Sequence, residues 1–308
     1  MLSLRLSLPS VATLSQGVRL AYWDALTVSA LPSWLTLTRA TTGTYFDASA
    51  VMQSAAINAA RFDHNPLTGA ALGVLCESSR TNLMANSDEP GSWTPSYQNA
   101  TKGSVIVGPN GATSARRITF GAADYFYGRT SASYAPAAYT GSVHVRSAGK
   151  SSICVRIDAT ANGSNDFRAQ VAIASAWVRP ARTFALAATD TIDLGFDNRV
   201  GNGGDGIAGA LDAFGGQIEA GAFASSYIPT SGVPVTRAAD ALSIAAGYSG
   251  NPIIVETQSV ATGALSRTLY NPGSGISALA DVWLRKAAVY RIGAPAGVLN
   301  AIVAGGAW

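Results

Sequence analysis

Short segments in which apolar and polar residues alternate run through most of the chain. They are five to nine residues long, and glycine, asparagine, aspartate, serine or proline separates them; SVIVG, TGSVHVRS, SSICVRIDA, DFRAQVAIA and DTIDLGF are examples. A period of two is typical of a strand with one buried face, and regularly spaced short strands favour a sandwich. The sequence therefore predicts an all-β protein built on a β-sandwich or jelly roll.

The N-terminus shows the same alternation. Leu2, Leu4, Leu6 and Leu8 alternate with serine and arginine, which predicts a half-buried strand rather than the unbroken apolar core of a signal peptide. An apolar strand edge needs another chain to cover it, so we expect these leucines to serve attachment or oligomerisation. The chain has no run of 18 apolar residues that would span a membrane.

Turn signals and changes in composition divide the chain into four parts. These are an N-terminal β arm (1–38), a turn-rich β lead-in (39–86), the regular run of strands (87–230) and a small C-terminal β region (231–308). Within the lead-in, RFDHNPLTGAALG predicts a hairpin in which Asp63 and Asn65 favour the turn, Pro66 fixes φ and Gly69 has a positive φ. Helical patterns are weak and occur at 49–60 and 274–287.

Composition adds three expectations. The 308 residues carry 13% charged side chains and a net charge of +3, with no dense basic patch, which argues against nucleic-acid binding. So few charges leave large neutral surfaces, and a homo-oligomer is therefore expected. Cys76 and Cys154 lie in apolar runs and are expected to be buried free thiols, with a disulfide as the alternative.

Two blocks of sequence resemble segments of tailed-phage and prophage fibre, spike and tail proteins. The first runs from TRATTGTYFD through RFDHNPLTG to ESSRTNL, and the second is GGQIEAGAFASSYIPTSGVPVTRAAD. The residues that carry the likeness in the first block are Thr38, Arg39, Ala40, Tyr45, Phe46, Asp47, Arg61, Phe62, Asp63, Pro66, Thr68, Gly69, Glu77, Arg80, Thr81, Asn82 and Leu83.

The resemblance implies a jelly-roll domain between the two blocks, similar to carbohydrate-binding modules and concanavalin-like lectins. A chain of 308 residues is compact for a tail fibre, and it also resembles head-spike or head-fibre proteins of phages and gene transfer agents. The resemblance therefore implies a virion protein that is assembled in the bacterial cytoplasm without a signal peptide. Other virion proteins and a cell-surface or capsular polysaccharide would be its partners. A trimer would suit a tail fibre, and five-fold assembly a head vertex.

Aromatic residues in polar surroundings are the candidates for glycan contact. Sugars present an apolar C–H face and a rim of hydroxyls, so a site needs flat rings beside hydrogen-bonding groups. Aromatic residues of the sandwich could equally fill its core. The candidate residues are Trp93, Tyr97, Asp124, Tyr125, Tyr127, Arg129 and Tyr134.

No cofactor is expected, although two groups of residues could hold structural Ca²⁺. The first is the loop DNRVGNGGDG (197–206), and the second combines Asp88 and Glu89 with Asp212. His64 and His144 have no metal-ligand spacing and no nucleophile motif. We therefore do not expect an enzyme. Asp158 with Asp166, or Asp190 with Asp193, are carboxylate pairs without a motif.

Three functions remain open on these grounds. The first is a structural virion protein, a head spike or fibre, that helps a phage-like particle adsorb to a host polysaccharide. The second is a structural adaptor that anchors another receptor-binding fibre without binding glycan. The third is a polysaccharide depolymerase, which would need a carboxylate pair in a groove.

Overall fold

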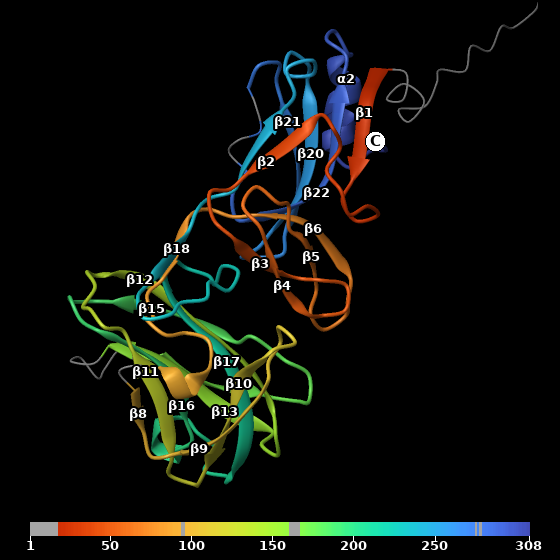
Figure 1. Ribbon diagram of the computed structural model, residues 1–308. Coiled ribbons are helices and arrows are strands. Elements are labelled where there is room, and N and C mark those ends of the chain that lie inside the picture. The colour runs from red at the N-terminus through yellow and green to blue at the C-terminus, as the bar shows by residue number, and fades with distance from the viewer. Residues whose placement is uncertain (1–17, 94–95, 160–166, 275, 277–278) are drawn as a thin grey trace, which may run out of the picture.

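The computed structural model describes residues 18–308 apart from 94–95, 160–166, 275 and 277–278. Figure 1 shows two lobes joined end to end, the lower one formed by the middle of the chain and the upper one by its two ends. Regular structure is almost entirely antiparallel strand, so the predicted all-β class is confirmed. None of the helices in the described residues is long and apolar enough to cross a membrane.

The lower lobe is a sandwich of two five-stranded sheets. The first sheet, β15–β12–β17–β10–β9, contains β9 (Thr101–Val107), β10 (Thr113–Phe120), β12 (Ala137–Ser147), β15 (Ala181–Leu186) and β17 (Gly209–Ala220). The second, β14–β13–β16–β11–β8, contains β8 (Ser96–Gln98), β11 (Tyr125–Arg129), β13 (Ser152–Ala159), β14 (Phe167–Ala172) and β16 (Ile192–Asp197). The chain passes repeatedly from one sheet to the other, as in a jelly roll. Two short 3₁₀ turns, η1 (Pro90–Ser92) and η2 (Val200–Asn202), complete the lobe.

Alternation along the strands fills the space between these sheets. In β13, Ile153, Val155 and Ile157 are fully buried, and in β16 the same holds for Leu194 and Phe196. Fully burying one side chain of this size contributes about 1.5–3 kcal/mol. The intervening residues of β13 and β16 point to the outer face of the second sheet, where the candidate site lies.

The upper lobe joins the two ends of the chain in one six-stranded sheet, β21–β20–β22–β6–β5, with β1 also paired to β22. Its strands are β1 (Arg19–Asp24), β5 (Phe62–His64), β6 (Ala71–Cys76), β20 (Ile253–Ser259), β21 (Leu265–Tyr270) and β22 (Val282–Tyr290). The described parts of 1–38 and 231–308 therefore fold together rather than as an arm and a separate region.

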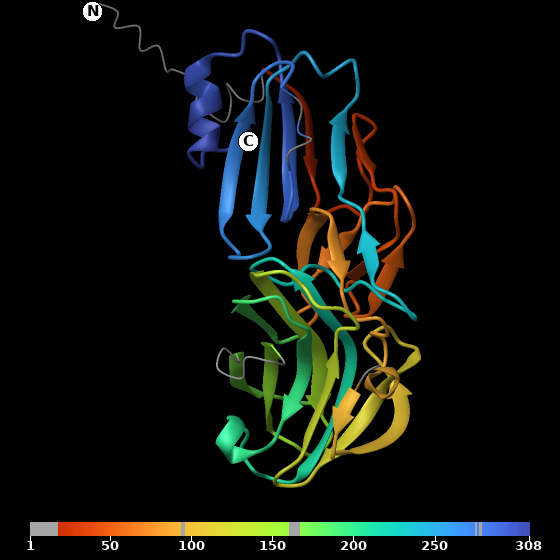
Figure 2. The ribbon, with the colours of Figure 1, turned by 90° about the vertical axis from the view of Figure 1, so that its left-hand side faces the viewer.

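Both faces of this sheet are covered. Helix α2 (Ala296–Val303) packs Leu299 and Ile302 against Ile254 and Tyr290, and Figure 2 shows it beside the sheet at the far end of the lobe. The other face packs against a cluster that includes Trp23 and Trp34.

Three further two-stranded sheets complete the structure. They are β2 (Leu35–Thr38) with β19 (Ala241–Ile244), β3 (Gly43–Phe46) with β4 (Met52–Ala55), and β7 (Arg80–Asn82) with β18 (Val235–Arg237). Strands β7 and β18 run side by side between the lobes in Figure 1. The two blocks of sequence that carry the phage-protein resemblance therefore pair with each other.

The predicted hairpin at 61–73 is confirmed. Strands β5 and β6 pair, the side chain of Asn65 accepts hydrogen bonds from the backbone of Leu67 and Thr68, and Gly69 has a φ of 69°. That φ is in the left-handed region, which glycine adopts without a steric penalty.

Both helical predictions are wrong in the described residues. Residues 52–55 form β4, and Ala50 and Asn58 beside it have positive φ, which no α-helix allows. Strand β22 begins at Val282, where its pairing with β20 and β6 outweighs the weak helical preference of the sequence. Helix α2 was not predicted.

Two further predictions concern the N-terminal leucines and the two cysteines. Leu2, Leu4, Leu6 and Leu8 lie outside the described residues, so their role in attachment stays a prediction. Cys76 and Cys154 are free and buried, as predicted. Burial raises the pKa of the Cys154 thiol to about 11, which keeps it protonated and unreactive near neutral pH.

Candidate functional site

Five charged residues of the two resemblance blocks form a buried ion-pair network between the lobes. Arg61 donates through Nη1 to Glu77 Oε2 at 2.6 Å and through Nη2 to Asp240 Oδ2 at 2.5 Å. Arg39 Nη1 donates to the other oxygen of Asp240 at 2.9 Å, and Arg237 Nη2 lies 3.4 Å from Glu77. All five side chains are 0–1% exposed.

These residues come from five separate places in the chain, next to β2, β5, β6, β18 and β19. Each carboxylate is shared by two or more guanidinium groups, which is the geometry that makes a buried charge tolerable. The network therefore explains the conspicuous lead-in sequence as architecture: it ties the lead-in to the block that closes the sandwich.

The pKa of Glu77 reflects this setting. Burial alone would raise it, but the charges of Arg61 and Arg237 and hydrogen bonds from Ser226 outweigh burial and lower the pKa to about 2. Because the ordinary value is 4.5, the ionised form is favoured in the folded protein.

Acid should therefore weaken the fold through Glu77. A carboxyl with a lowered folded pKa contributes stability that is present above its unfolded pKa and is lost as the pH falls toward the folded pKa. Between about pH 5 and about pH 2, we expect the urea midpoint of wild type to fall more steeply than that of Glu77→Gln. Burial raises the pKa of Asp63 and Glu219, so their contribution to stability changes with pH in the opposite direction. That contribution is present in both wild type and Glu77→Gln. Parallel pH profiles would contradict the assignment to Glu77.

A second cluster, which we call the tyrosine–arginine face, covers the outer surface of the sheet β14–β13–β16–β11–β8. On β11, Phe126 points into the core and is fully buried, whereas Tyr125 and Tyr127 point outward and are half-buried. Neighbouring strands and the loop after β16 complete the face. Its members are Tyr125, Tyr127, Arg129, Arg156, Asp158, Arg168, Asp193, Asp197 and Arg199.

The two tyrosine rings are stacked and each contacts a guanidinium. Their centroids are 5.5 Å apart with an interplanar angle of 28°. The guanidinium carbon of Arg199 lies 4.6 Å from the Tyr125 centroid, and that of Arg156 lies 4.5 Å from the Tyr127 centroid. Such contacts are cation–π interactions.

Glycine makes the second of these contacts feasible. Gly195 lies between Tyr127 and Arg156 in the strand register. A Cβ at Gly195 would approach Phe126 O to 2.2 Å and Tyr127 Cβ to 2.6 Å, so a side chain does not fit there. Arg156 can therefore reach across the intervening strand to the tyrosine.

Buried carboxylates hold the arginines of the face in place. Arg129 donates to both oxygens of Asp193 at 2.7 and 3.0 Å, and Arg199 to both oxygens of Asp197 at 2.9 and 2.6 Å. Arg156 pairs with Asp158 and Asp197, and Arg168 with Asp158. The aspartate side chains are 0–3% exposed and the arginine side chains 9–36% exposed.

Burial has different net effects on the pKa values of two of these aspartates. Burial would raise the pKa of Asp197, but hydrogen bonds from Arg199 outweigh it and lower the pKa. Burial raises the pKa of Asp193 even though Arg129 opposes the shift. The face therefore presents ring surface and partly exposed guanidinium groups outward, over carboxylates that solvent barely reaches.

Of the predicted glycan-binding residues, the structure brings together Tyr125, Tyr127 and Arg129. Strand β8 pairs Tyr97 with Tyr127 through the backbone, and the Tyr97 side chain lies outside the described residues. Asp124 is next to the face, but its carboxylate accepts a hydrogen bond from the backbone of Gly121 and so shapes the turn before β11.

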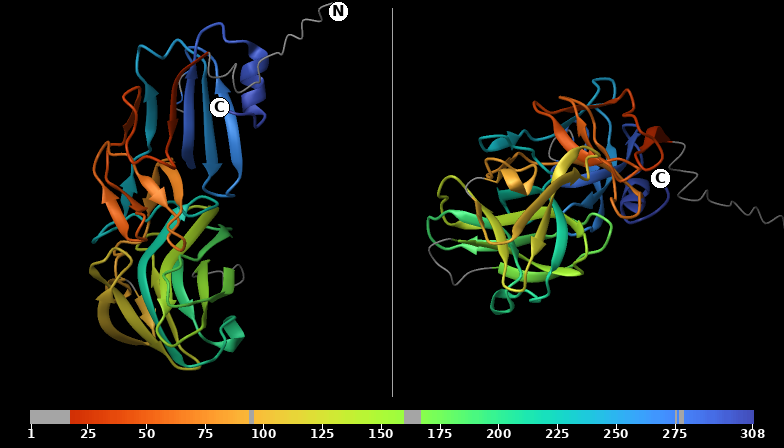
Figure 3. Two further views of the ribbon diagram at one scale, coloured as in Figure 1. Left: turned by 90° about the vertical axis from the view of Figure 1, so that its right-hand side faces the viewer. Right: turned by 60° about the horizontal axis from the view of Figure 1, so that its bottom comes forward.

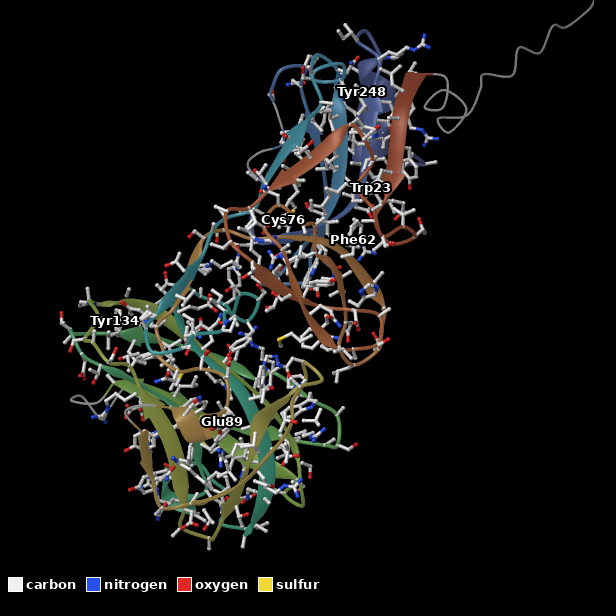
Figure 4. All side chains as sticks on the ribbon, in the orientation of Figure 1. Trp23, Phe62, Cys76, Glu89, Tyr134 and Tyr248 are labelled. Atoms are coloured by element: carbon white, nitrogen blue, oxygen red, sulfur yellow. The ribbon has the colours of Figure 1, made fainter. Side chains whose placement is uncertain are left out.

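Trp93 and Tyr134 lie elsewhere. Trp93 is 1% exposed within the sandwich core, so the prediction that it contacts glycan is wrong. Tyr134 lies with Arg80 and Tyr139 in a separate pocket of about 300 Å³, and Figure 4 shows it at the edge of the lower lobe.

Sequence reasoning missed Arg156, Asp193, Asp197 and Arg199 as members of one cluster. The signal was present, because SSICVRIDA and DTIDLGFD place charged residues at every second or fourth position opposite the buried ones. What was missing is the strand order that sets β13, β16 and β11 side by side.

The carboxylates considered for calcium are engaged by other side chains. Glu89 pairs with Arg116, Asp212 with Arg117 and Arg146, and Asp88 accepts from Tyr227. In the loop 197–206, Asp197 pairs with Arg199 and Asp205 with Lys150. Across the described residues, no group of three or more histidine, cysteine or acidic side chains has the arrangement of a metal site.

No protein-family model matches the sequence, and no curated protein matches it. Several solved structures are similar to part of the chain, among them the following three. A family 4 carbohydrate-binding module matches 43% of this chain and 84% of its own, at 15% identity and a TM-score of 0.31. The C-terminal family 6 carbohydrate-binding module of a laminarinase from Zobellia galactanivorans matches 47% of this chain and 100% of its own, at 11% identity and 0.30.

The third is the enzymatically active domain of tailspike protein 4 from bacteriophage CBA120. The match spans 46% of this chain and 19% of the tailspike chain, at 7% identity and a TM-score of 0.31. Each of the three matches covers less than half of this chain, and what the chain binds has to be inferred from its own side chains.

Proposed function

We propose that the protein binds glycan through the tyrosine–arginine face, as a head-spike or fibre protein that adsorbs a phage-like particle to a host cell-surface polysaccharide. One observation carries the proposal. Tyr125 and Tyr127 are stacked on an outer sheet face, beside guanidinium groups that buried aspartates fix in position.

The chemistry of this face suits a sugar polymer. Tyrosine rings offer apolar surface for C–H groups, and guanidinium N–H groups donate to hydroxyls. Because Arg156 and Arg199 already contact the rings, we expect a sugar to lie against ring edges, tyrosine hydroxyls and guanidinium edges together. Ion pairs that fix the arginines beforehand reduce the entropy lost on binding.

Several copies would strengthen a weak contact. A single open face gives modest affinity for each sugar, whereas a homo-oligomer that presents several faces gains avidity for a repeating polymer. The shape of the chain supports this arrangement, since Figure 3 shows the sandwich at the end opposite to β1. The N-terminal leucines would then attach to a neighbouring virion protein while the sandwich points outward.

Binding of the purified full chain to host capsule or envelope polysaccharide tests the proposal. We expect saturable binding that Tyr125→Ala/Tyr127→Ala weakens at least about tenfold, because two ring contacts are lost. Tyr22→Ala is a matched control, since Tyr22 is an exposed tyrosine, 39% accessible, in the other lobe. Circular dichroism would confirm that all variants fold.

An oligomeric wild type that does not bind would overturn the proposal and favour the structural adaptor. The depolymerase alternative has one specific observation in its favour: Asp158 and Asp193 are directly opposite each other on β13 and β16. Arginines pair with both, so we propose binding without turnover. Release of new reducing ends from the polysaccharide, lost in Asp193→Asn, would contradict this.

A further inference from the structure

A pocket of about 140 Å³ lies between the two lobes, away from the tyrosine–arginine face. The upper lobe and the connecting strands contribute Phe46, Glu77 and Trp283 to its wall, and the sandwich contributes His144 and Arg179. Trp283 and Arg179 are half-buried, so the pocket communicates with the surface.

Arg179 has an unpaired edge in this pocket. Its Nη1 donates to Ser225 O at 2.5 Å, but Nε and Nη2 are buried and have no hydrogen-bond partner among the described residues. Nε and Nη2 lie on the edge of a guanidinium that binds a carboxylate with two parallel hydrogen bonds. Elsewhere in this protein the same two atoms hold a carboxylate in Arg116, Arg117, Arg129 and Arg199.

An unpaired buried guanidinium edge is unfavourable for the fold. Burying a charged donor without a partner costs free energy that a structural role would have to offset. Burial lowers the pKa of Arg179, although the more distant charges of Glu219 and Glu77 oppose the shift. Unpaired Nε atoms also occur in Arg61 and Arg237 of the buried network, but Arg179 leaves both atoms of its carboxylate-binding edge unpaired, and a ligand carboxylate would pair them.

The charged groups of the pocket other than Arg179 are already engaged, whereas both ring nitrogens of His144 are buried without a hydrogen-bond partner among the described residues. Glu77 is bonded to Arg61 and Ser226, and Asp63 accepts from Phe46 N and from Trp283 Nε1. The adjacent network has three arginines for two carboxylates, so its surplus charge is also positive. The pocket therefore combines an unpaired cationic edge with aromatic wall.

We propose that this pocket binds an acidic sugar, with the carboxylate on Nε and Nη2 of Arg179 and the ring against Phe46 and Trp283. The aromatic wall favours a sugar ring over a bare anion, because a small anion would leave the rings without contact. This site is separate from the tyrosine–arginine face and does not depend on it.

Calorimetric titration of the full chain with D-glucuronate, D-glucose and acetate tests the proposal. We expect D-glucuronate to bind at least about tenfold more tightly than either of the others, since it alone offers both the carboxylate and the ring. Arg179→Gln should lose that preference. Arg182→Gln is the control, because Arg182 is a nearby arginine that is not part of the pocket wall. Tyr125→Ala/Tyr127→Ala should keep D-glucuronate binding, which separates this site from the proposed polysaccharide face.

Thermal unfolding provides a second readout. Without ligand, Arg179→Gln should melt at a higher temperature than wild type because an unpaired buried charge is removed; D-glucuronate should raise the melting temperature of wild type alone. Equal affinity for D-glucuronate and D-glucose, or a preference that survives in Arg179→Gln, would overturn the proposal. Acetate binding as tight as D-glucuronate binding would overturn the assignment to a sugar.

Discussion

Replacing Arg61 by glutamine is expected to destabilise the protein by about 3–5 kcal/mol, the cost of breaking a buried ion pair from one side. Arg61 is the residue that bridges Glu77 and Asp240, with contacts of 2.6 and 2.5 Å and no exposed side-chain surface. Glutamine is too short and uncharged to satisfy both carboxylates. Each would then keep fewer partners in a place that water does not reach.

Urea unfolding monitored by circular dichroism measures this effect. Lys286→Gln is a suitable control, because Lys286 also pairs with a carboxylate, that of Asp24, but at 3.5 Å and with side chains 24% and 18% exposed. We expect the control to cost less than about 1 kcal/mol. A loss in Arg61→Gln no larger than in Lys286→Gln would show that the network does not hold the lobes together.

The same network shows how far the sequence could be interpreted. The resemblance to phage proteins singled out Arg39, Arg61 and Glu77, and turn chemistry predicted the hairpin that contains Gly69. Pairing between Arg61 and Asp240 joins residues 179 positions apart. A contact of that kind depends on which strands are neighbours, and local patterns do not contain that information.

The tyrosine–arginine face was predictable to a similar extent. The candidates Tyr125, Tyr127 and Arg129 are every second residue, and in a strand such residues lie on one side because successive residues point to opposite faces. It could not show that Asp193 and Asp197 lie on the next strand, or that Gly195 gives Arg156 access to Tyr127. The side chains that orient the arginines came from strand order and register.

Trp93 was misinterpreted for a related reason. It lies in a segment rich in serine, glycine and proline, a composition typical of surface loops, yet it enters the sandwich core directly after η1. Two glycines make the space: a Cβ on Gly128 of β11 would lie 3.0 Å from the indole, and one on Gly216 of β17 only 2.6 Å from it. The glycines at 128 and 216 were therefore the sequence feature that could have indicated a buried Trp93.

Trp93→Ala is therefore expected to cost about 3–5 kcal/mol, the range for deleting a large aromatic side chain from a core. The indole packs on Phe126 at 5.7 Å between ring centroids, and its Nε1 donates to the carbonyl oxygen of Ser87 at 3.3 Å. Glycines at 128 and 216 have no side chains that could fill the cavity. Urea unfolding of Trp93→Ala beside Trp177→Ala, a half-buried tryptophan over Arg146, would measure the difference.

Polysaccharide binding by Trp93→Phe separates the two roles considered for this residue. Phenylalanine retains part of the packing and removes the indole, so the variant should fold with reduced stability. If Trp93 acts only within the core, the folded variant should bind polysaccharide within about twofold of wild type, since roughly 0.4 kcal/mol corresponds to that factor. A tenfold loss of binding with an unchanged urea midpoint would instead restore Trp93 as a glycan contact, and would require the sandwich to open around it.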